Sequence, residues 1–282
     1  MTQLTKQDIL FHQNEVPWPV LYQVEQDLLL CRAMIAIFND PFLAGQVAMR
    51  GGTVLHKVHL APASRYSEDI DLVIVGDRPE EHIRLALNRV LKDILGKEKL
   101  SAWDTLKLAV RNMAKPSRIL RVIYEVRSVV ESGRILKVEL EANVTERKPY
   151  QPISKLPFSL PFRGEQLSTT IRSFDINEML GTKMRALFQR VKGRDLFDLY
   201  WALTAPSATT VDCDEVIRCF QHYMKAEETV VPREEFLEHL ATRLKDSGFC
   251  SDMQPLLRSG LDYDVQAAGM LVRDNLIMRL EE

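Results

Sequence analysis

Two aspartates spaced two residues apart, Asp69 and Asp71, are the side chains of this sequence best suited to chemistry. The surrounding residues, 70–75, are mostly β-branched and apolar, which predicts a β-strand. Side chains alternate along a strand, so both carboxylates lie on one face, with α carbons about 6.5 Å apart. Carboxylates at this spacing can share one or two Mg²⁺ ions, which prefer hard oxygen ligands. The pattern predicts a metal site of the kind used in phosphoryl or nucleotidyl transfer.

A third carboxylate is available on a second predicted strand, residues 134–141. Apolar and charged residues alternate there, so Glu139 and Glu141 share the face opposite the core. We predict Glu139 as the third metal ligand, with Glu141 in reserve. Alternating charge is also typical of a solvated strand face, and an Asp-x-Asp pattern alone is weak evidence. The metal site therefore needs support from other residues.

A glycine pair, Gly51-Gly52, supplies part of that support. It follows a short apolar segment and precedes an amphipathic stretch, 53–60, which predicts a turn that leads into a short helix. Glycine lets the backbone come close to a ligand, and N–H groups at the start of a helix attract phosphate. A phosphate-binding turn just ahead of metal-binding carboxylates suits a triphosphate substrate.

A basic cluster lies much later in the chain, between residues 183 and 194, with no acid among its members. The five cations are Lys183, Arg185, Arg190, Lys192 and Arg194. Lys183 and Arg190, seven residues apart, share one helix face, and the cluster predicts a positive field for phosphates. Asp195 and Asp198 share a face of the next predicted helix. The alternative is a solvated face on which Arg194 pairs with Asp198.

The elements that must position these residues divide the chain into two parts. An α/β half, 1–170, contains the predicted helices 21–38, 53–60 and 80–95 and the predicted strands 70–75, 106–110, 119–129 and 134–141. Prolines at 149, 152, 157 and 161 predict a linker or an irregular edge. An all-helical half, 171–282, contains the predicted helices 176–191, 194–204, 211–225, 233–246 and 263–280. We expect two domains with a ligand cleft between them.

Composition excludes several classes of protein. With 46% hydrophobic and 27% charged residues and a net charge of −2, the chain of 282 residues is typical of a globular protein and unlike a generally basic nucleic-acid coat protein. Its four cysteines are scattered, which argues against a zinc or disulfide framework. We find no signal peptide and no membrane span, and expect a cytoplasmic protein without a membrane partner. His56 and His59 could touch substrate, although this spacing is more typical of a helix face.

Together these residues resemble a known family. The motifs are G-G-T-x-L-x-K at 51–57, R-x-S-x-D-I-D-L at 65–72, a strand that carries a carboxylate, and E-x-x-x-x-K-x-x-A-L-x-x-R-x-x-x-R-D-x-x-D-L-Y at 178–200. In this order they closely resemble the AbiEii-type nucleotidyltransferase toxins of bacterial type IV toxin–antitoxin and abortive-infection systems. The resemblance spans about residues 25–205.

The resemblance implies a fold and a set of site residues. The fold would be α+β, a polymerase-β-like nucleotidyltransferase core with a mixed sheet, followed by an all-helical C-terminal domain. The metal ligands would be Asp69, Asp71 and Glu139. The catalytic set would add Lys183, Asp195 and Asp198. The nucleotide and phosphate contacts would come from Gly51, Gly52, Thr53, Lys57, Arg65, Ser67, Lys183 and Arg190.

The activity implied by this resemblance is Mg²⁺-dependent transfer of a nucleotide from a nucleoside triphosphate to RNA, with the 3′ end of tRNA as the expected acceptor. A site of the two-metal type, and an antitoxin repressor encoded nearby as partner, belong to the same expectation. Two alternatives stay open: the same fold acting on a protein or small-molecule hydroxyl, or a catalytically idle scaffold that binds a partner. The joint presence of Asp69, Asp71, Glu139 and Lys183 argues against the idle scaffold.

Overall fold

A single mixed sheet forms the centre of the N-terminal half. The computed structural model describes residues 4–106, 117–205 and 211–282. Within these ranges the sheet has seven strands, β1 (Val47–Met49), β2 (Asp69–Ile74), β3 (Glu98–Leu106), β4 (Ser117–Arg127), β5 (Ile135–Asn143), β6 (Ser154–Phe162) and β7 (Glu165–Ser173). Their order is β3-β4-β5-β2-β1-β7-β6, with parallel pairing only at β2–β5 and β1–β7 among the described strands.

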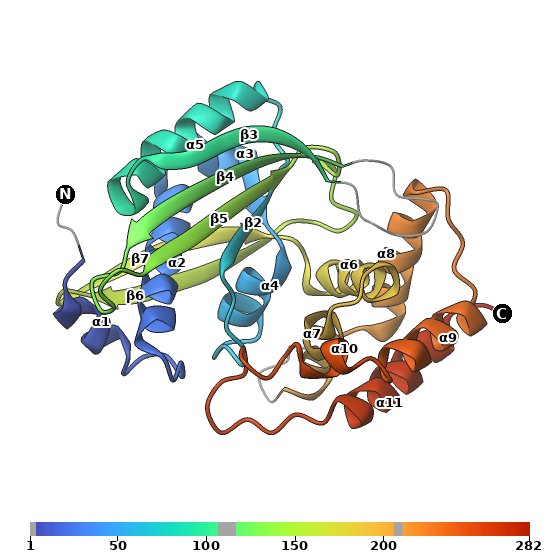
Figure 1. Cartoon of the computed structure of the whole chain (residues 1–282). Helices are drawn as coiled ribbons and strands as arrows, with labels where there is room; N and C mark the ends of the chain where they lie inside the picture. Colours follow the sequence, from blue (N-terminus) through green and yellow to red (C-terminus); the bar gives the residue numbers. More distant parts are fainter. Residues whose placement is uncertain (1–3, 107–116, 206–210) are drawn as a thin grey trace.

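The helices fall into two groups. The first group consists of α1 (Lys6–His12), α2 (Leu21–Asn39), α3 (Leu43–Gln46), α4 (Gly51–Val54), the π-helical turn η1 (Leu55–His59) and α5 (Glu80–Leu95). The second group consists of α6 (Ile176–Gln189), α7 (Gly193–Thr204), α8 (Cys213–Ala226), α9 (Arg233–Arg243), α10 (Ser247–Ser251), α11 (Val265–Asn275) and the 3₁₀ turn η2 (Ile277–Arg279). Figure 1 shows α2 and α5 against the sheet and α6 to α11 gathered beyond it.

The sequence pattern explains the layers. Strand β5 alternates between exposed or half-buried charged residues and fully buried apolar ones, so one face meets the core and the other lies open. Helix α2 is buried on nearly every side because it packs against α5, β6 and β7. Its Gln26 donates a hydrogen bond to the carbonyl oxygen of Lys137 at 2.6 Å, which ties the helix to β5. The open face of β2 and β5 is thereby left for the site.

The predictions differ from the structure in the strands. The prolines do mark an edge of the sheet, but it is a regular strand, because Ser154–Phe162 pairs with Glu165–Ser173 in a long antiparallel hairpin. Strand β6 is at the edge of the sheet, where prolines that cannot donate a ladder bond are tolerated. The strand predicted at 106–110 lies mostly outside the described residues; the strand found there, β3, begins at Glu98.

The helical half agrees closely with the sequence pattern. All five predicted helices are present, although the last one ends at Asn275 and continues as η2. Asp175 caps α6 by accepting a hydrogen bond from the Asn177 backbone, directly after β7. A boundary at residue 170 would cut through β7, so we propose the division into two domains with its limit at 174–175. No helix in the described part of the chain is long and apolar enough to cross a membrane.

Candidate active site

The pairing of β2 with β5 brings the predicted carboxylates side by side. The two strands run parallel, and the register places Asp69 opposite Glu139 and Asp71 opposite Glu141. Opposite residues share a face, so four carboxylates separated by about 70 positions in the chain form one acidic surface. We call these four residues the acidic wall.

Like charges dominate the acidic wall. Burial and repulsion from Asp71, Glu139, Glu68 and Glu141 raise the pKa of Asp69 to about 7. Burial, followed by repulsion from Glu141, also raises the pKa of Asp71. Neither Asp69 nor Asp71 forms an ion pair with any residue that the structure describes. Lys183, Arg50 and Arg190 lower the pKa of Asp71 only in part, against the rise caused by burial and by Glu141.

The two glutamates of the acidic wall, by contrast, hold an arginine. Arg121 on β4 lies 2.8 Å (Nε) from Glu139 Oε1 and 2.7 Å (Nη2) from Glu141 Oε1. Its third nitrogen, Nη1, lies 3.5 Å from Asp104 on β3. The sequence pattern gave no reason to expect Arg121 here, because the β4–β5 register creates the contact.

The glycine pair packs closely against Asp71 of the acidic wall and against Arg65. Gly51 has φ +85°, and a Cβ on it would meet Asp71 Oδ2 at 2.0 Å. A Cβ on Gly52 would meet Arg65 Nη2 at 2.2 Å. Gly51 therefore requires glycine for its backbone conformation and for space, whereas a side chain at Gly52 would displace the Arg65 guanidinium.

Two residues of the predicted phosphate set point elsewhere. Thr53 is fully buried, and its hydroxyl donates to Ser67 Oγ at 2.8 Å and contacts the backbone oxygen of Asp69 at 2.5 Å. Lys57 is ion-paired with the buried Asp27 on α2. The helix that follows the glycine turn rotates these side chains away from the acidic wall and into the core. The prediction that Lys57 binds phosphate is therefore corrected, and Thr53 connects the turn to β2.

A basic wall faces the carboxylates from α6 and α7. Lys183 Nζ lies 2.8 Å from Asp198 Oδ2 and 3.4 Å from Asp195 Oδ1. Arg190 forms a bidentate pair with Asp195, in which Nε lies 2.6 Å from Oδ2 and Nη2 lies 2.8 Å from Oδ1. Both aspartates are fully buried beneath these cations. We call Arg65, Lys183 and Arg190, together with these two aspartates, the basic wall.

Asp198 also forms polar contacts with residues of the N-terminal half of the chain. Arg65 donates from Nε and Nη2 to both of its oxygens, at 2.6 and 2.9 Å. His56 Nε2 lies 2.8 Å from Oδ1, while Ser64 Oγ contacts Nδ1 at 2.9 Å. Burial would raise the pKa of Asp198, but Arg65, Lys183 and His56 hold it well below its usual value. Burial lowers the pKa of His56 to about 4, so this ring is neutral and structural.

Two further cations of the basic cluster, Arg185 and Arg194, are paired as well. Arg194 lies 3.4 Å from Asp252, so the predicted bridge from Arg194 to Asp198 is wrong. Arg185 binds Glu146 at 2.6 Å and Glu227 at 3.2 Å, and Glu146 also pairs with Arg50. The positive field expected from this segment is consequently reduced by carboxylates that come from distant elements.

A cleft of roughly 410 Å³ lies between the two walls. The predicted residues that line it are Gly51, Gly52, Arg65, Ser67, Asp69, Asp71, Glu139, Lys183 and Arg190. Thr53, Lys57, Asp195 and Asp198 do not line it. The reserve ligand Glu141 and the other cations of the basic cluster, Arg185, Lys192 and Arg194, line it too. Residues that line it without having been predicted for the site are Arg50, Asn143, Glu146, Thr182, Ala186 and Gln189. Arg50 could have been predicted for the site because it directly precedes the glycine pair in the sequence. No sequence pattern indicated Glu146.

The donor set of the cleft fits a hard divalent cation. Asp69 and Asp71 offer carboxylate oxygens, and their raised pKa values reflect a negative charge that a cation would neutralise. Glu139 is less suited, because Arg121 already holds it.

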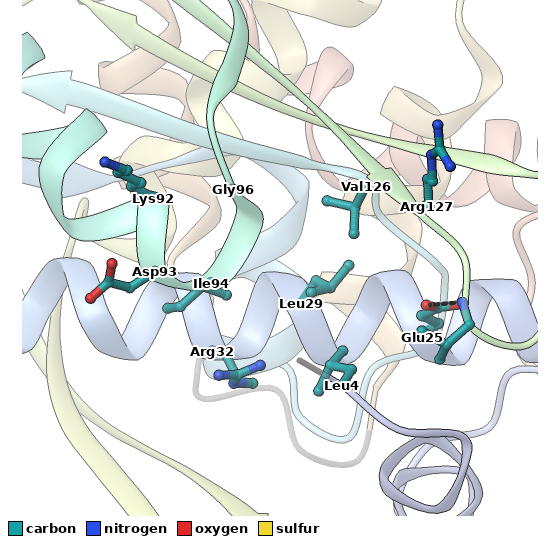
Figure 2. A pocket seen from close by; sticks show the side chains of 11 residues that line it. Leu4, Glu25, Leu29, Arg32, Lys92, Asp93, Ile94, Gly96, Val126 and Arg127 are labelled. Carbon is teal, nitrogen blue, oxygen red and sulfur yellow. Dashed lines mark hydrogen bonds between the residues drawn. The ribbon is translucent and has the colours of Figure 1, made fainter. Parts of the chain in front are cut away.

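Two other features of the molecule are not candidates. His12, Asp27 and Cys31 form a cluster at metal-ligand spacing, but Lys57 and His12 already neutralise Asp27 there. A second cavity, of about 210 Å³, lies between α2, α5 and β4 (Figure 2). Its buried carboxylate, Glu25, accepts hydrogen bonds from Ser128 and the Val129 backbone, which leaves little chemistry for a ligand.

Comparisons with known proteins agree with this geometry. The model of a family described as the nucleotidyl transferase AbiEii toxin of type IV toxin–antitoxin systems matches residues 32–269. The solved structure of MenT4, a nucleotidyltransferase toxin from Mycobacterium tuberculosis H37Rv, is similar, with a TM-score of 0.61 and 18% identity. The similarity covers 99% of this chain and 91% of that one, and at this identity it shows the fold alone. No curated protein matches the sequence.

Proposed function

The chain belongs to the AbiEii nucleotidyltransferase toxin family of type IV toxin–antitoxin systems, and we propose that it transfers a nucleotide from a nucleoside triphosphate to an RNA acceptor. The expected acceptor is the 3′ end of tRNA. The observation that carries the proposal is the cleft itself, in which Asp69 and Asp71, without an ion pair to any described residue, face the paired cations Lys183 and Arg190. A polyphosphate bound through a cation satisfies both sides at once.

The acidic wall would hold the cation. Asp69 and Asp71 are its proposed ligands, and Mg²⁺ bound there would supply charge neutralisation and orientation of the triphosphate. Gly51 and Gly52 line the cleft and carry no side chain of their own, so their backbone could approach the phosphates.

The basic wall would stabilise the charge that develops on the phosphates. Lys183 and Arg190 line the cleft with fixed positions, because Asp195 and Asp198 hold them from below. The acceptor hydroxyl attacks the α-phosphorus in line and loses its proton to solvent, a P–O bond forms, and the bond to the pyrophosphate leaving group breaks. We propose Asp195 and Asp198 as positioning residues, since neither lines the cleft.

The family implies an antitoxin partner, which we propose to be a repressor encoded nearby. We also propose that the protein acts in the cytoplasm, where both substrates are present. Residues Lys192 and Arg194 at the mouth of the cleft are suited to contact an acceptor backbone.

The test is transfer itself. Purified protein is incubated with Mg²⁺, each α-labelled nucleoside triphosphate in turn, and total tRNA, total protein or a small-molecule pool. We expect label on tRNA, and none with an Asp69→Asn variant. Label on protein or on a small molecule would show that the acceptor is not RNA. Absence of transfer under every condition would contradict the proposal as a whole. An Arg118→Gln variant, changed on the same sheet but outside the cleft, serves as the matched control.

A further inference from the structure

Arg121 is a cation within the acidic wall that the proposed mechanism does not use. Its guanidinium lies 2.8 Å from Glu139 and 2.7 Å from Glu141, and it retains 30% of its side-chain exposure. Such charge-assisted bonds from a planar guanidinium are stronger than neutral ones. Arginine also keeps its charge at any physiological pH, so it competes with other cations under all conditions.

The register shows how Arg121 comes to hold both glutamates. Asp71 lies opposite Glu141 on β5, and Glu141 lies opposite Arg121 on β4, so the three form one row across the sheet. Glu139 belongs to the next row, with Asp69, yet its carboxylate reaches diagonally to Arg121. Diagonal neighbours on a sheet face are within reach of long side chains. The Glu139 carboxylate is therefore directed toward β4, away from its neighbour on β2.

The result is that the expected third ligand does not join the other two. Among the described residues, the group of His, Cys and acidic side chains with ligand atoms within 4.8 Å of one another is His12, Asp27 and Cys31. Asp69, Asp71 and Glu139 do not meet that spacing. A cation that used Glu139 would have to displace its ion pair with Arg121, whose guanidinium also donates two charge-assisted hydrogen bonds to Glu141.

We propose that Arg121 limits the site to one divalent cation, held by Asp69 and Asp71, because its guanidinium occupies Glu139 and Glu141 in place of a second ion. Arg121 is thus a positioning residue that acts through the two glutamates. The inference rests on the proposed metal-dependent transfer, and it replaces the expected two-metal arrangement. It predicts the metal stoichiometry, which is measurable without substrate.

The experiment is a Mn²⁺ titration of the full chain without nucleotide, followed by the electron paramagnetic resonance signal of free Mn²⁺. We expect about one ion per wild-type chain and about two in Arg121→Gln. Arg118→Gln, on the same strand and paired with Glu80, is the matched control and should keep one. Asp69→Asn should weaken the single ion by about tenfold or more.

A second variant keeps the inference testable if Arg121→Gln does not fold. Glu139→Gln in the otherwise wild-type chain should change the affinity for the single ion less than about twofold, since Glu139 does not hold it. In the Arg121→Gln background the same change should remove the second ion. Two ions in the wild type, or a loss in Glu139→Gln as large as in Asp69→Asn, would overturn the inference while leaving metal-dependent transfer intact. A wild-type chain that binds no Mn²⁺ would overturn both.

Discussion

The carboxylates of the acidic wall and those of the basic wall have opposite electrostatic surroundings. On the acidic wall, burial and repulsion from neighbouring carboxylates raise the pKa values of Asp69 and Asp71. On the basic wall, Asp195 and Asp198 are buried more deeply, yet their pKa values are lowered because arginine and lysine surround them. The same residue type therefore serves two purposes within one cleft.

The opposite pKa shifts distinguish carboxylates suited to bind a ligand from carboxylates that are already ion-paired within the protein. A raised pKa shows that the ionised carboxylate is destabilised in the folded protein, and a bound cation would stabilise it. Such perturbed pKa values are common at functional sites. A fully paired buried network holds its cations in place but is expensive to disturb, since removal of one partner leaves a charge uncompensated. The acidic wall should thus tolerate neutral substitution, and the basic wall should not.

The largest expected effect follows from removal of Asp198. In Asp198→Ala the buried Arg65 and Lys183 lose their shared carboxylate, and we expect the free energy of unfolding to fall by about 3–5 kcal/mol. Asp71→Asn, the matched change on the acidic wall, should leave it unchanged or raise it in metal-free protein. Urea unfolding of both variants measures this. Equal losses of free energy of unfolding in the two variants would contradict the distinction between the two walls.

The glycine turn between the walls should be nearly as sensitive. Gly51→Ala places a Cβ 2.0 Å from Asp71 Oδ2 at a φ of +85°, so we expect a loss of about 1–3 kcal/mol and of transfer activity. Gly45→Ala is the control, because a Cβ there meets no atom within 4 Å. It should stay within about 0.5 kcal/mol of wild type. An active Gly51→Ala variant would show that the turn does not approach the substrate.

The pH dependence of stability should distinguish the walls by its sign. Asp69 has a folded pKa of about 7 against an ordinary 3.8, so its share of stability is present below pH 4 and is lost as pH rises to about 7. His56, with a pKa lowered to about 4, acts oppositely and contributes stability that is lost as pH falls below 6.5.

Asp69→Asn isolates the first contribution. Its stability relative to wild type should rise between about pH 4 and pH 7 in metal-free protein, as measured by urea unfolding across that range. Saturating Mg²⁺ should abolish the advantage, because the cation stabilises the ionised wild-type side chain. A difference that stays constant with pH would show that the pKa of Asp69 is ordinary.

The smallest effect is expected at the mouth of the cleft. Lys192 is exposed and lines the cleft, so Lys192→Ala should leave stability within about 0.5 kcal/mol. We expect KM for the triphosphate or the acceptor to rise about two- to fivefold at low salt. The difference should vanish at about 1 M salt, where the Debye length is about 3 Å. A salt-independent effect would mean that Lys192 makes a direct, desolvated contact.

Much of the site could be predicted because it depends on local periodicity. Asp69 and Asp71 share a face since side chains alternate along β2. The shared helix face predicted for Lys183 and Arg190 is not what places them, because α6 ends at Gln189 and Arg190 has extended backbone; their pairs with Asp195 bring the two cations together. Lys57 was predicted wrongly because the spacing of a motif does not tell which side of a turn each residue will face. The β6–β7 hairpin was missed since prolines suit an edge strand, and edge position is a property of the whole sheet.

The sequence by itself determined which side chains share a face, and thereby the aspartate pair, the glycine turn, the basic helix and the family. Only the tertiary structure decided which charge neutralises which. Arg121 reaches Glu139 through the β4–β5 register, and Arg65 reaches Asp198 across the two halves of the chain. Periodicity acts over a few residues, whereas ion pairs between distant elements depend on how those elements pack. The glycine turn and Asp69 thus face a basic wall whose cations were visible in the sequence, while their partners were not.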